Sequence, residues 1–378
     1  MKLISIGQFD RNIIYPILGG IFSFIIKLLL SYDLTILTEH SLILSINSSL
    51  GMSLAFIFVL LYKKKSKTDE ISKPKNKGHN IELEYINQYE EIRYNKFKYI
   101  LLSSIIDFII TVLICTYCIG LGINMWTLEI LFIYLFSYII FRIKIYRHHY
   151  ISGLIILIFG IILNLIDRRY NLTYESLNPF LIKLFCEYLL SFALVINKFT
   201  MEKKFCSSYE LCFYQGFITL IFYTIFLILD QFLKIIGDDL MEYYIDFKKS
   251  IAKETFMFLL VMFLLFFKNL FIFATIEKIT PFHYLIILVI GELSSSIKNI
   301  RKKNIIENIF ITICFYIIFF MILVFNEIIE LKCFGLNKNT KKGISKRADM
   351  DNINKELRNE SIFSEDESET ITMEESIA

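Results

Sequence analysis

The sequence has few residues that break helices or let them pack closely: 4 prolines and 14 glycines among 378 residues. No Walker-type glycine-rich loop is present, which argues against direct use of ATP. The formal net charge is only +3, so the charge balance gives no reason to expect a nucleic-acid partner. No cleavable secretory signal is expected either, because Lys27 interrupts the first apolar stretch and no small-residue cleavage pattern follows it.

The seven cysteines are scattered along the chain. Cys115 and Cys118 form a C-x-x-C pair, but it lies in an apolar stretch with no further Cys or His nearby. Packing thiols are therefore favoured over a metal or redox site. The adjacent His148 and His149 fall in a hinge between helices and are given no ligand role. We expect no cofactor and no bound metal.

What the chain has in abundance is apolar sequence. Hydrophobic residues make up 55% of it and the mean hydropathy is +0.56, which predicts an integral membrane protein. A spanning helix needs roughly 20 predominantly apolar residues. An all-α polytopic protein with ten transmembrane helices is therefore expected, and a count of nine stays open. The ten segments are Ile13–Tyr32, Ser41–Tyr62, Lys98–Ile119, Met125–Phe141, Ile151–Ile166, Phe180–Phe199, Ser208–Leu229, Thr255–Ile276, Pro281–Ile297 and Ile305–Phe325.

The distribution of Lys and Arg predicts the orientation. Ten spans put both termini on one side, and the segments on that side carry more than twice as many Lys and Arg as the others. Positive charge favours the cytosol, so both termini are expected there. The basic segment Lys298–Lys303 does not fit, and a re-entrant ninth helix would move it to the cytosolic side.

Two stretches of the sequence share one plan. In residues 129–166 an apolar helix ends at a basic hinge and a second apolar helix follows. Residues 285–324 repeat this order of helix, basic hinge and helix. The stretches occupy positions four–five and nine–ten among the expected spans. The chain therefore divides into five plus five helices, and because five is odd, the two halves would have opposite orientations.

This division predicts three regions. Residues 1–166 form a first five-helix repeat that contains a cytosolic linker at 63–97. Residues 167–330 form the second repeat, and residues 331–378 form a disordered cytosolic tail that is basic first and then rich in Glu and Ser.

The two-times-five layout, and especially Phe136–Leu163 with its basic turn and its two glycines Gly153 and Gly160, resembles the drug/metabolite transporter superfamily. The EamA-like and nucleotide-sugar transporters belong to it. The resemblance implies an inverted-repeat carrier of an internal membrane. The chain departs from that family in its scarcity of Gly and Ala, so large side chains are expected to keep the helices apart.

Charged residues inside the spans are the candidate site, because a charge in hydrocarbon is costly and usually faces a partner or a polar route. Seven lie there: Lys27, Asp107, Glu129, Lys183, Glu187, Lys268 and Glu292.

Lys268 is the leading candidate for substrate binding, as a cation that holds a phosphate or carboxylate where Coulomb attraction is strong. The structural alternative is a Lys paired with Asp107 or Glu292, or one that reaches toward the interface. Asn269 beside it would add an amide donor. Glu292 is interpreted either as a proton-coupling carboxylate or as a counter-ion.

Glu129 completes the expected substrate-binding set, although it lies near a membrane face. Lys183 and Glu187 are four residues apart and therefore share one helix face, so we expect a structural ion pair.

The leading functional hypothesis is a secondary transporter, not an enzyme, that moves a small, anionic solute such as a nucleotide sugar by alternating access. The expected partners are membrane lipid and this solute, and a homodimer is an open alternative. Golgi or ER membranes are the first localisation and the plasma membrane the second. Two alternatives remain: a membrane glycosyl- or acyltransferase that uses Asp238, Asp239 and Glu242, and a transporter-like regulatory protein.

Overall fold

The computed structural model describes residues 4–6, 11–31, 40–61, 79–117, 125–143, 146–171, 177–204, 206–236, 240–300, 305–331 and 340. Contacts divide the chain into two units. The large unit comprises residues 10–144 and 153–322, and the small unit comprises residues 1–9, 145–152 and 323–378.

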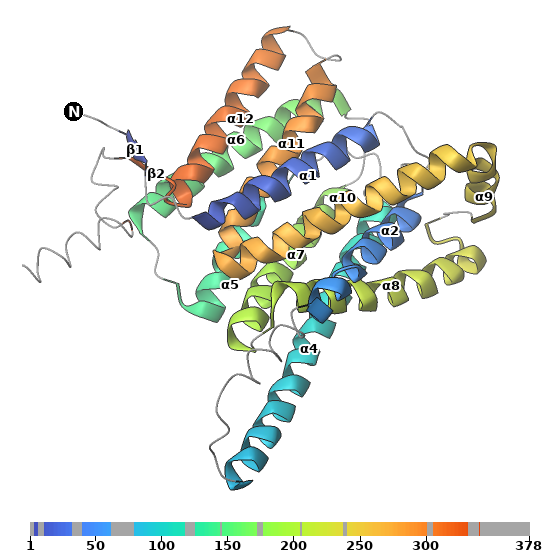
Figure 1. Ribbon diagram of the computed structural model, residues 1–378. Coiled ribbons are helices and arrows are strands. Elements are labelled where there is room, and N and C mark those ends of the chain that lie inside the picture. Colours follow the sequence, from blue (N-terminus) through green and yellow to red (C-terminus); the bar gives the residue numbers. More distant parts are fainter. Residues whose placement is uncertain are drawn as a thin grey trace, which may run out of the picture. The chain divides into compact units, whose positions relative to one another are not determined.

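The described chain is helical apart from two strands of three residues, β1 (Ile4–Ile6) and β2 (Ile329–Leu331) (Figure 1). The helices are α1 (Ile14–Ser31), α2 (Ser41–Ser53), α4 (His79–Tyr117), α5 (Glu129–Phe141), α6 (Arg147–Asn171), α7 (Leu177–Lys203), α8 (Ser208–Leu233), α9 (Leu240–Lys249), α10 (Ile251–Lys278), α11 (Tyr284–Ile300) and α12 (Ile305–Phe325). The 3-10 turns η1 (Arg11–Ile13), η3 (Trp126–Leu128) and η4 (Pro281–His283) lead into α1, α5 and α11.

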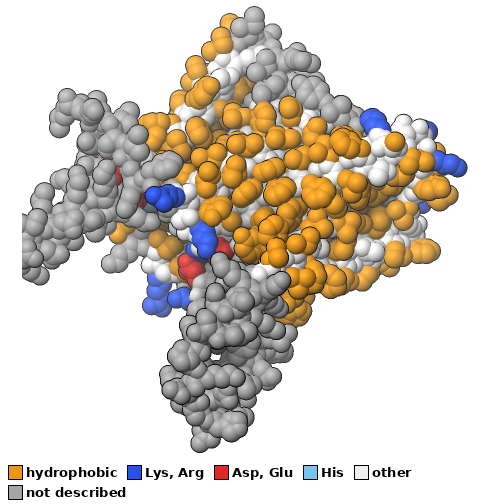
Figure 2. Space-filling view, in the orientation of Figure 1, with side chains coloured by type: hydrophobic (Ala, Val, Ile, Leu, Met, Phe, Trp, Pro, Cys, Tyr) orange, Lys and Arg blue, Asp and Glu red, His pale blue; other side chains and the backbone are white. Residues whose placement is uncertain are grey.

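Within the described residues, eight helical segments are long and apolar enough to cross a membrane, which makes this a multi-pass membrane protein by helix length and hydropathy. All ten expected segments are helical. Two of the apolar segments are shorter than the others, Trp126–Phe141 and Pro281–Ser294, although helix α11 itself continues beyond Ser294 to Ile300. These two are the fourth and the ninth of the expected series. Over the described part of the molecule, the face in Figure 2 is covered with hydrophobic side chains, as a lipid-facing surface requires.

The segment 63–97 contains helical residues that the sequence did not indicate. Helix α4 begins at His79, well inside the expected linker, and continues without a break into the third apolar segment. The first part of the linker and nearly all of the tail after Leu331 lie outside the described residues. The predicted disorder of that tail therefore stays a prediction.

The helices of the large unit pack in a recurring pattern. Helix α1 packs against α10 and α11, whereas α7 packs against α4 and α5. Helix α2 packs against α8 and α10, and α8 also packs against α4. Figure 1 shows α1 between α11 and α10. Helices α1 and α7 thus play matching parts, each against two helices of the other half of the sequence.

Several of the few glycines stand where two helices approach each other closely. A Cβ on Gly51 of α2 would lie 2.7 Å from the backbone oxygen of Met262 in α10. A Cβ on Gly216 of α8 would lie 2.9 Å from the backbone nitrogen of Ser53. Large side chains therefore do not keep these helices apart, contrary to expectation, because the scarce glycines are placed at the crossings.

Gly51→Ala should destabilise the large unit by about 1–3 kcal/mol, because the new methyl group meets backbone that cannot move aside alone. Gly19→Ala is the matched control on α1: its Cβ would meet side-chain atoms, Ile287 Cδ1 at 3.0 Å and Phe271 Cβ at 3.2 Å, which yield more easily. Thermal unfolding of the purified protein in detergent measures both. Equal losses for the two variants would contradict the assignment of Gly51 to a backbone contact.

Candidate functional site

Two helices from opposite halves of the sequence are joined by an ion pair. Lys27 of α1 binds the carboxylate of Glu292 of α11 through its Nζ atom. Close approach is possible because Gly291 precedes Glu292: a Cβ there would lie 2.5 Å from Ser23 Oγ and 3.9 Å from Lys27 Cε. The Lys27 side chain keeps 37% of its surface exposed and the Glu292 side chain only 11%, so the carboxylate is the more buried partner.

A second group of charges lies between α5 and α7. Lys183 Nζ is 3.0 Å from Glu187 Oε1, one turn further along α7, which confirms the predicted ion pair. Glu129 at the first turn of α5 interacts with both Glu187 and Lys183. Its residue surface is only 2% exposed. Ser191 bridges the helices, since its hydroxyl donates to the backbone oxygen of Glu187 at 2.8 Å and to that of Glu129 at 3.5 Å.

Asp107 of α4 and Lys268 of α10 form the third group. Their charges attract each other, and Lys268 also experiences the positive charge of Lys27. Asp107 receives a long hydrogen bond of 3.5 Å from the hydroxyl of Tyr223 in α8, which in turn lies 2.8 Å from the hydroxyl of Thr111. Both charged residues are partly buried.

One tyrosine lies within electrostatic range of carboxylates from all three groups. Tyr284 at the start of α11 is buried and interacts electrostatically with Glu129, Glu187, Asp107 and Glu292. The seven charged residues predicted from the sequence therefore converge in the large unit, drawn from six helices: α1, α4, α5, α7, α10 and α11. We call these seven residues together with Tyr284 the charged cluster.

The cations of the cluster differ in how closely they are matched. Lys27 and Lys183 each have a carboxylate within 4.0 Å. Among the residues that the structure describes, Lys268 has no carboxylate within that distance; Asp107 acts on it from further away. Lys268 is therefore the cation with the most capacity left for another anion. The sequence alternative in which Lys268 pairs directly with Glu292 is replaced by the pair of Lys27 and Glu292.

Asn269, which the sequence places beside Lys268 as an amide donor, serves a different contact. Its amide donates to Ser48 Oγ at 3.3 Å and so ties α10 to α2. Consecutive helical residues point about 100° apart, which separates it from the face that carries Lys268. Asp238 and Asp239 of the enzyme alternative lie outside the described residues, and Glu242 is exposed on α9.

Two contributors could not be found from the sequence. Tyr284 is one of 22 tyrosines in a chain biased toward aromatic residues, so nothing singles it out. Lys198 of α7 is buried and donates to the backbone oxygens of Glu277 and Ile279 at 3.0 and 3.1 Å. It thereby satisfies carbonyl groups at the end of α10, the helix that carries Lys268. The only sequence signal for Lys198 is its spacing of four from Glu202, with which it pairs at 2.9 Å.

Comparison with known proteins gives no relative. The chain matches no protein-family model, and no curated protein matches it. The likeness to the drug/metabolite transporters therefore stays a resemblance.

A charge-removal cycle tests the first ion pair. Lys27→Met or Glu292→Leu alone should destabilise the protein by about 1–3 kcal/mol, because each leaves one charge in an apolar setting; the exposure of Lys27 keeps its loss toward the low end. The double variant should recover part of that loss. Thermal unfolding measures the stability of all three variants. If the loss of stability in the double variant equals the sum of the two single losses, the pair is not coupled.

Proposed function

We propose that the protein is a secondary transporter of a small anionic solute, built from ten membrane helices in two inverted five-helix repeats. The observation that carries the proposal is the convergence of seven ionisable side chains from six apolar helices. A charge at the centre of a membrane helix costs about 2.5–3.5 kcal/mol on insertion scales, so such a concentration of charges needs a functional reason.

The helix contacts support the repeat. Exchanging each helix for the one five places along the series converts the contacts of α1 with α10 and α11 into the contacts of α7 with α4 and α5. The same exchange converts the contact of α2 with α10 into that of α8 with α4, and it leaves the contact of α2 with α8 unchanged. A two-fold relation between the halves accounts for all of these contacts at once.

The same exchange of helices also relates charged residues of the same type. A lysine on the first helix of one half meets a glutamate on the fourth helix of the other: Lys27 with Glu292, and Lys183 with Glu129. Asp107 and Lys268 lie on the third helix of each half and attract each other. Lys27 and Lys183 occupy different positions along their helices, and so do Glu292 and Glu129. The two lysine–glutamate groups are therefore not equivalent.

The fourth helix of each half carries a glutamate of the charged cluster. Glu129 lies in the apolar segment Trp126–Phe141, and Glu292 lies in the apolar segment Pro281–Ser294 of η4 and α11. The first of these segments is short, and unusually short helices are a common mark of a carrier's binding site. The start of the second segment contacts the first, because η4 packs against α5.

Lys268 is the residue that we expect to hold the solute. Lys27 and Lys183 are already neutralised at short range, whereas Lys268 keeps Coulomb attraction for a phosphate or carboxylate. A nucleotide sugar is the example that the family resemblance favours. A Golgi or ER membrane, cytosolic termini and a possible dimer remain predictions of the sequence.

Replacing Lys268 should abolish specific transport. In vesicles that contain the purified protein, Lys268→Gln should lower the uptake of labelled nucleotide sugar or phosphate ester by at least about tenfold, which corresponds to about 1.4 kcal/mol of binding or barrier. Lys253→Gln is the matched control: it lies on the same helix with its side chain 61% exposed, outside the cluster, and should transport normally.

The outcome is interpretable only if both variants fold, so their thermal unfolding is compared first. A panel of nucleotide sugars, phosphate esters and carboxylates is tested with the wild-type protein. If the protein exchanges none of them, the transporter proposal is contradicted. Equal activity of the Lys268→Gln and wild-type proteins would instead remove Lys268 from the site.

Proton coupling makes a separate prediction. Glu129 and Glu187 act on each other electrostatically, and two carboxylates close together in an apolar setting repel unless one of them carries a proton. If this proton moves with the solute, Glu129→Gln should make uptake insensitive to an imposed pH gradient while exchange without a gradient continues. Uptake that responds to the gradient equally in wild type and variant would place the coupling elsewhere or exclude it.

A further inference from the structure

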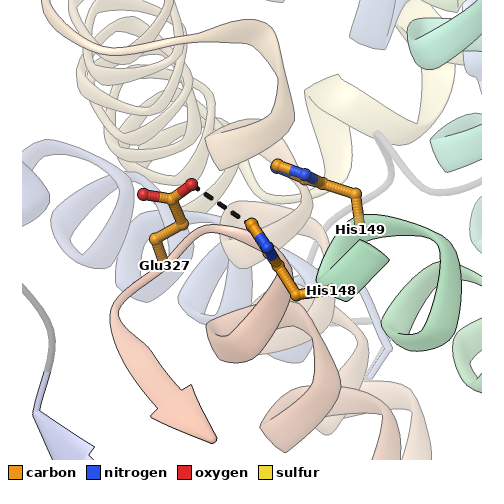
Figure 3. Close-up of side chains that lie close together, drawn as sticks. All are labelled: His148, His149 and Glu327. Carbon is orange, nitrogen blue, oxygen red and sulfur yellow. Dashed lines mark ion pairs between the residues drawn. The ribbon is translucent and has the colours of Figure 1, made fainter. Parts of the chain in front are cut away.

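In the small unit, three side chains with metal-binding atoms meet at a place that the transporter proposal does not use. They are His148 and His149, in the first turn of α6, and Glu327, just after the end of α12 (Figure 3). One ligand atom from each lies within 4.8 Å of the other two. We propose that His148, His149 and Glu327 bind a divalent transition-metal ion, with Zn²⁺ as the first choice.

The distances fit such an ion. His148 Nε2 lies 3.2 Å from Glu327 Oε1. Two ligands at about 2.0–2.1 Å from a tetrahedral zinc ion are themselves separated by about 3.4 Å. The two imidazole rings lie with their centroids 4.0 Å apart. A nitrogen of each ring lies within 4.8 Å of the other and of a Glu327 carboxylate oxygen. Two imidazoles and one carboxylate leave a fourth position for water or another ligand.

The backbone at Glu327 supports a role for its side chain. Its φ is +59°, in the left-handed region that residues other than glycine seldom adopt. The N–H groups of Glu327 and Ile328 donate to Val324 and Leu323 oxygens at 3.1 and 2.9 Å, which is the pattern of a Schellman helix end. Glycine is the usual residue at this position. A glutamate there accepts a conformational cost, and its carboxylate is directed at His148 (Figure 3).

The neighbouring structure holds all three ligands in place. The Ser152 hydroxyl donates to the His148 backbone oxygen at 2.6 Å, one turn further along α6. His148 is only 2% exposed, and the His149 ring packs edge-on against Phe325 at 4.9 Å between centroids. Two residues after Glu327, strand β2 begins and pairs with β1. Such anchoring orients ligands before an ion arrives.

The proposal explains a second contact as well. The pair of His148 and Glu327 does not by itself require His149 to lie beside it. A metal uses all three groups and joins the hinge before α6 to the segment that follows α12. The site lies in a different unit from the charged cluster, so it stands or falls independently of transport.

Metal binding by the purified full-length protein tests the proposal. After treatment with chelator and its removal, titration with ZnCl₂ should show one ion per chain, and CoCl₂ should give the visible absorption of a four-coordinate cobalt site. Zinc should also raise the thermal unfolding temperature, because it binds the folded state. His148→Ala and Glu327→Gln should each weaken binding by at least about tenfold and remove the zinc-dependent rise.

Two further variants keep the experiment decisive. Glu330→Gln is the control: it removes a carboxylate three residues away that accepts a hydrogen bond from Thr340 at 3.0 Å, and it should bind zinc like the wild type. Glu327→Gly should fold at least as stably as the wild type in chelator, because glycine adopts a positive φ without strain, yet it should not bind zinc.

Three results would overturn the site. One is the absence of stoichiometric zinc binding by the wild type. Another is zinc binding that survives the combined His148→Ala and Glu327→Gln changes, which would place the ion on other residues. The third is loss of binding with His148→Ala but none with Glu327→Gln, which would leave a two-histidine contact without the carboxylate.

Discussion

Hydrocarbon does not solvate charge, and this constraint decides how the helices of the large unit meet. Each charged side chain in an apolar helix must lie against an opposite charge or a polar group. Lys27 therefore joins α1 to α11, and the group of Glu129, Lys183 and Glu187 joins α5 to α7. Because each of these contacts spans the two halves of the sequence, the requirement to match charges also holds the halves together.

Close packing makes this matching possible in a chain with few small residues. Gly291 lets α11 approach Ser23 and Lys27 on α1, so the ion pair forms over a short distance. Gly51 and Gly216 play the same part where α2 meets α10 and α8. The 14 glycines are thus few, yet several stand at contacts where a Cβ would collide with a neighbour. A composition bias toward large apolar residues can be tolerated when the exceptions occupy the crossings.

The helices were predictable because hydropathy is a local property, and all ten apolar segments are helical. The start of α4 at His79 was not, because the polar residues before Lys96 carry no apolar signal although they continue the helix. The partners of the charged residues were harder to predict than the helices. Lys183 and Glu187 lie one turn apart and were predicted, but Lys27 and Glu292 are 265 residues apart and no periodicity relates them. The pairing of Glu327 with His148 could not be predicted either, because the two residues are far apart in the sequence and meet only after folding.

The imbalance within the charged cluster favours binding over a purely structural role. A bundle held together by charge alone is most stable when every charge has a close partner, as Lys27 and Lys183 have. Lys268 departs from that rule among the described residues: it is close enough to feel both Asp107 and Lys27, yet no carboxylate lies within 4.0 Å of it. Leaving one cation incompletely matched costs stability in the empty protein. That cost is understandable if an anionic solute completes the match in the course of transport, because the missing attraction then becomes binding energy.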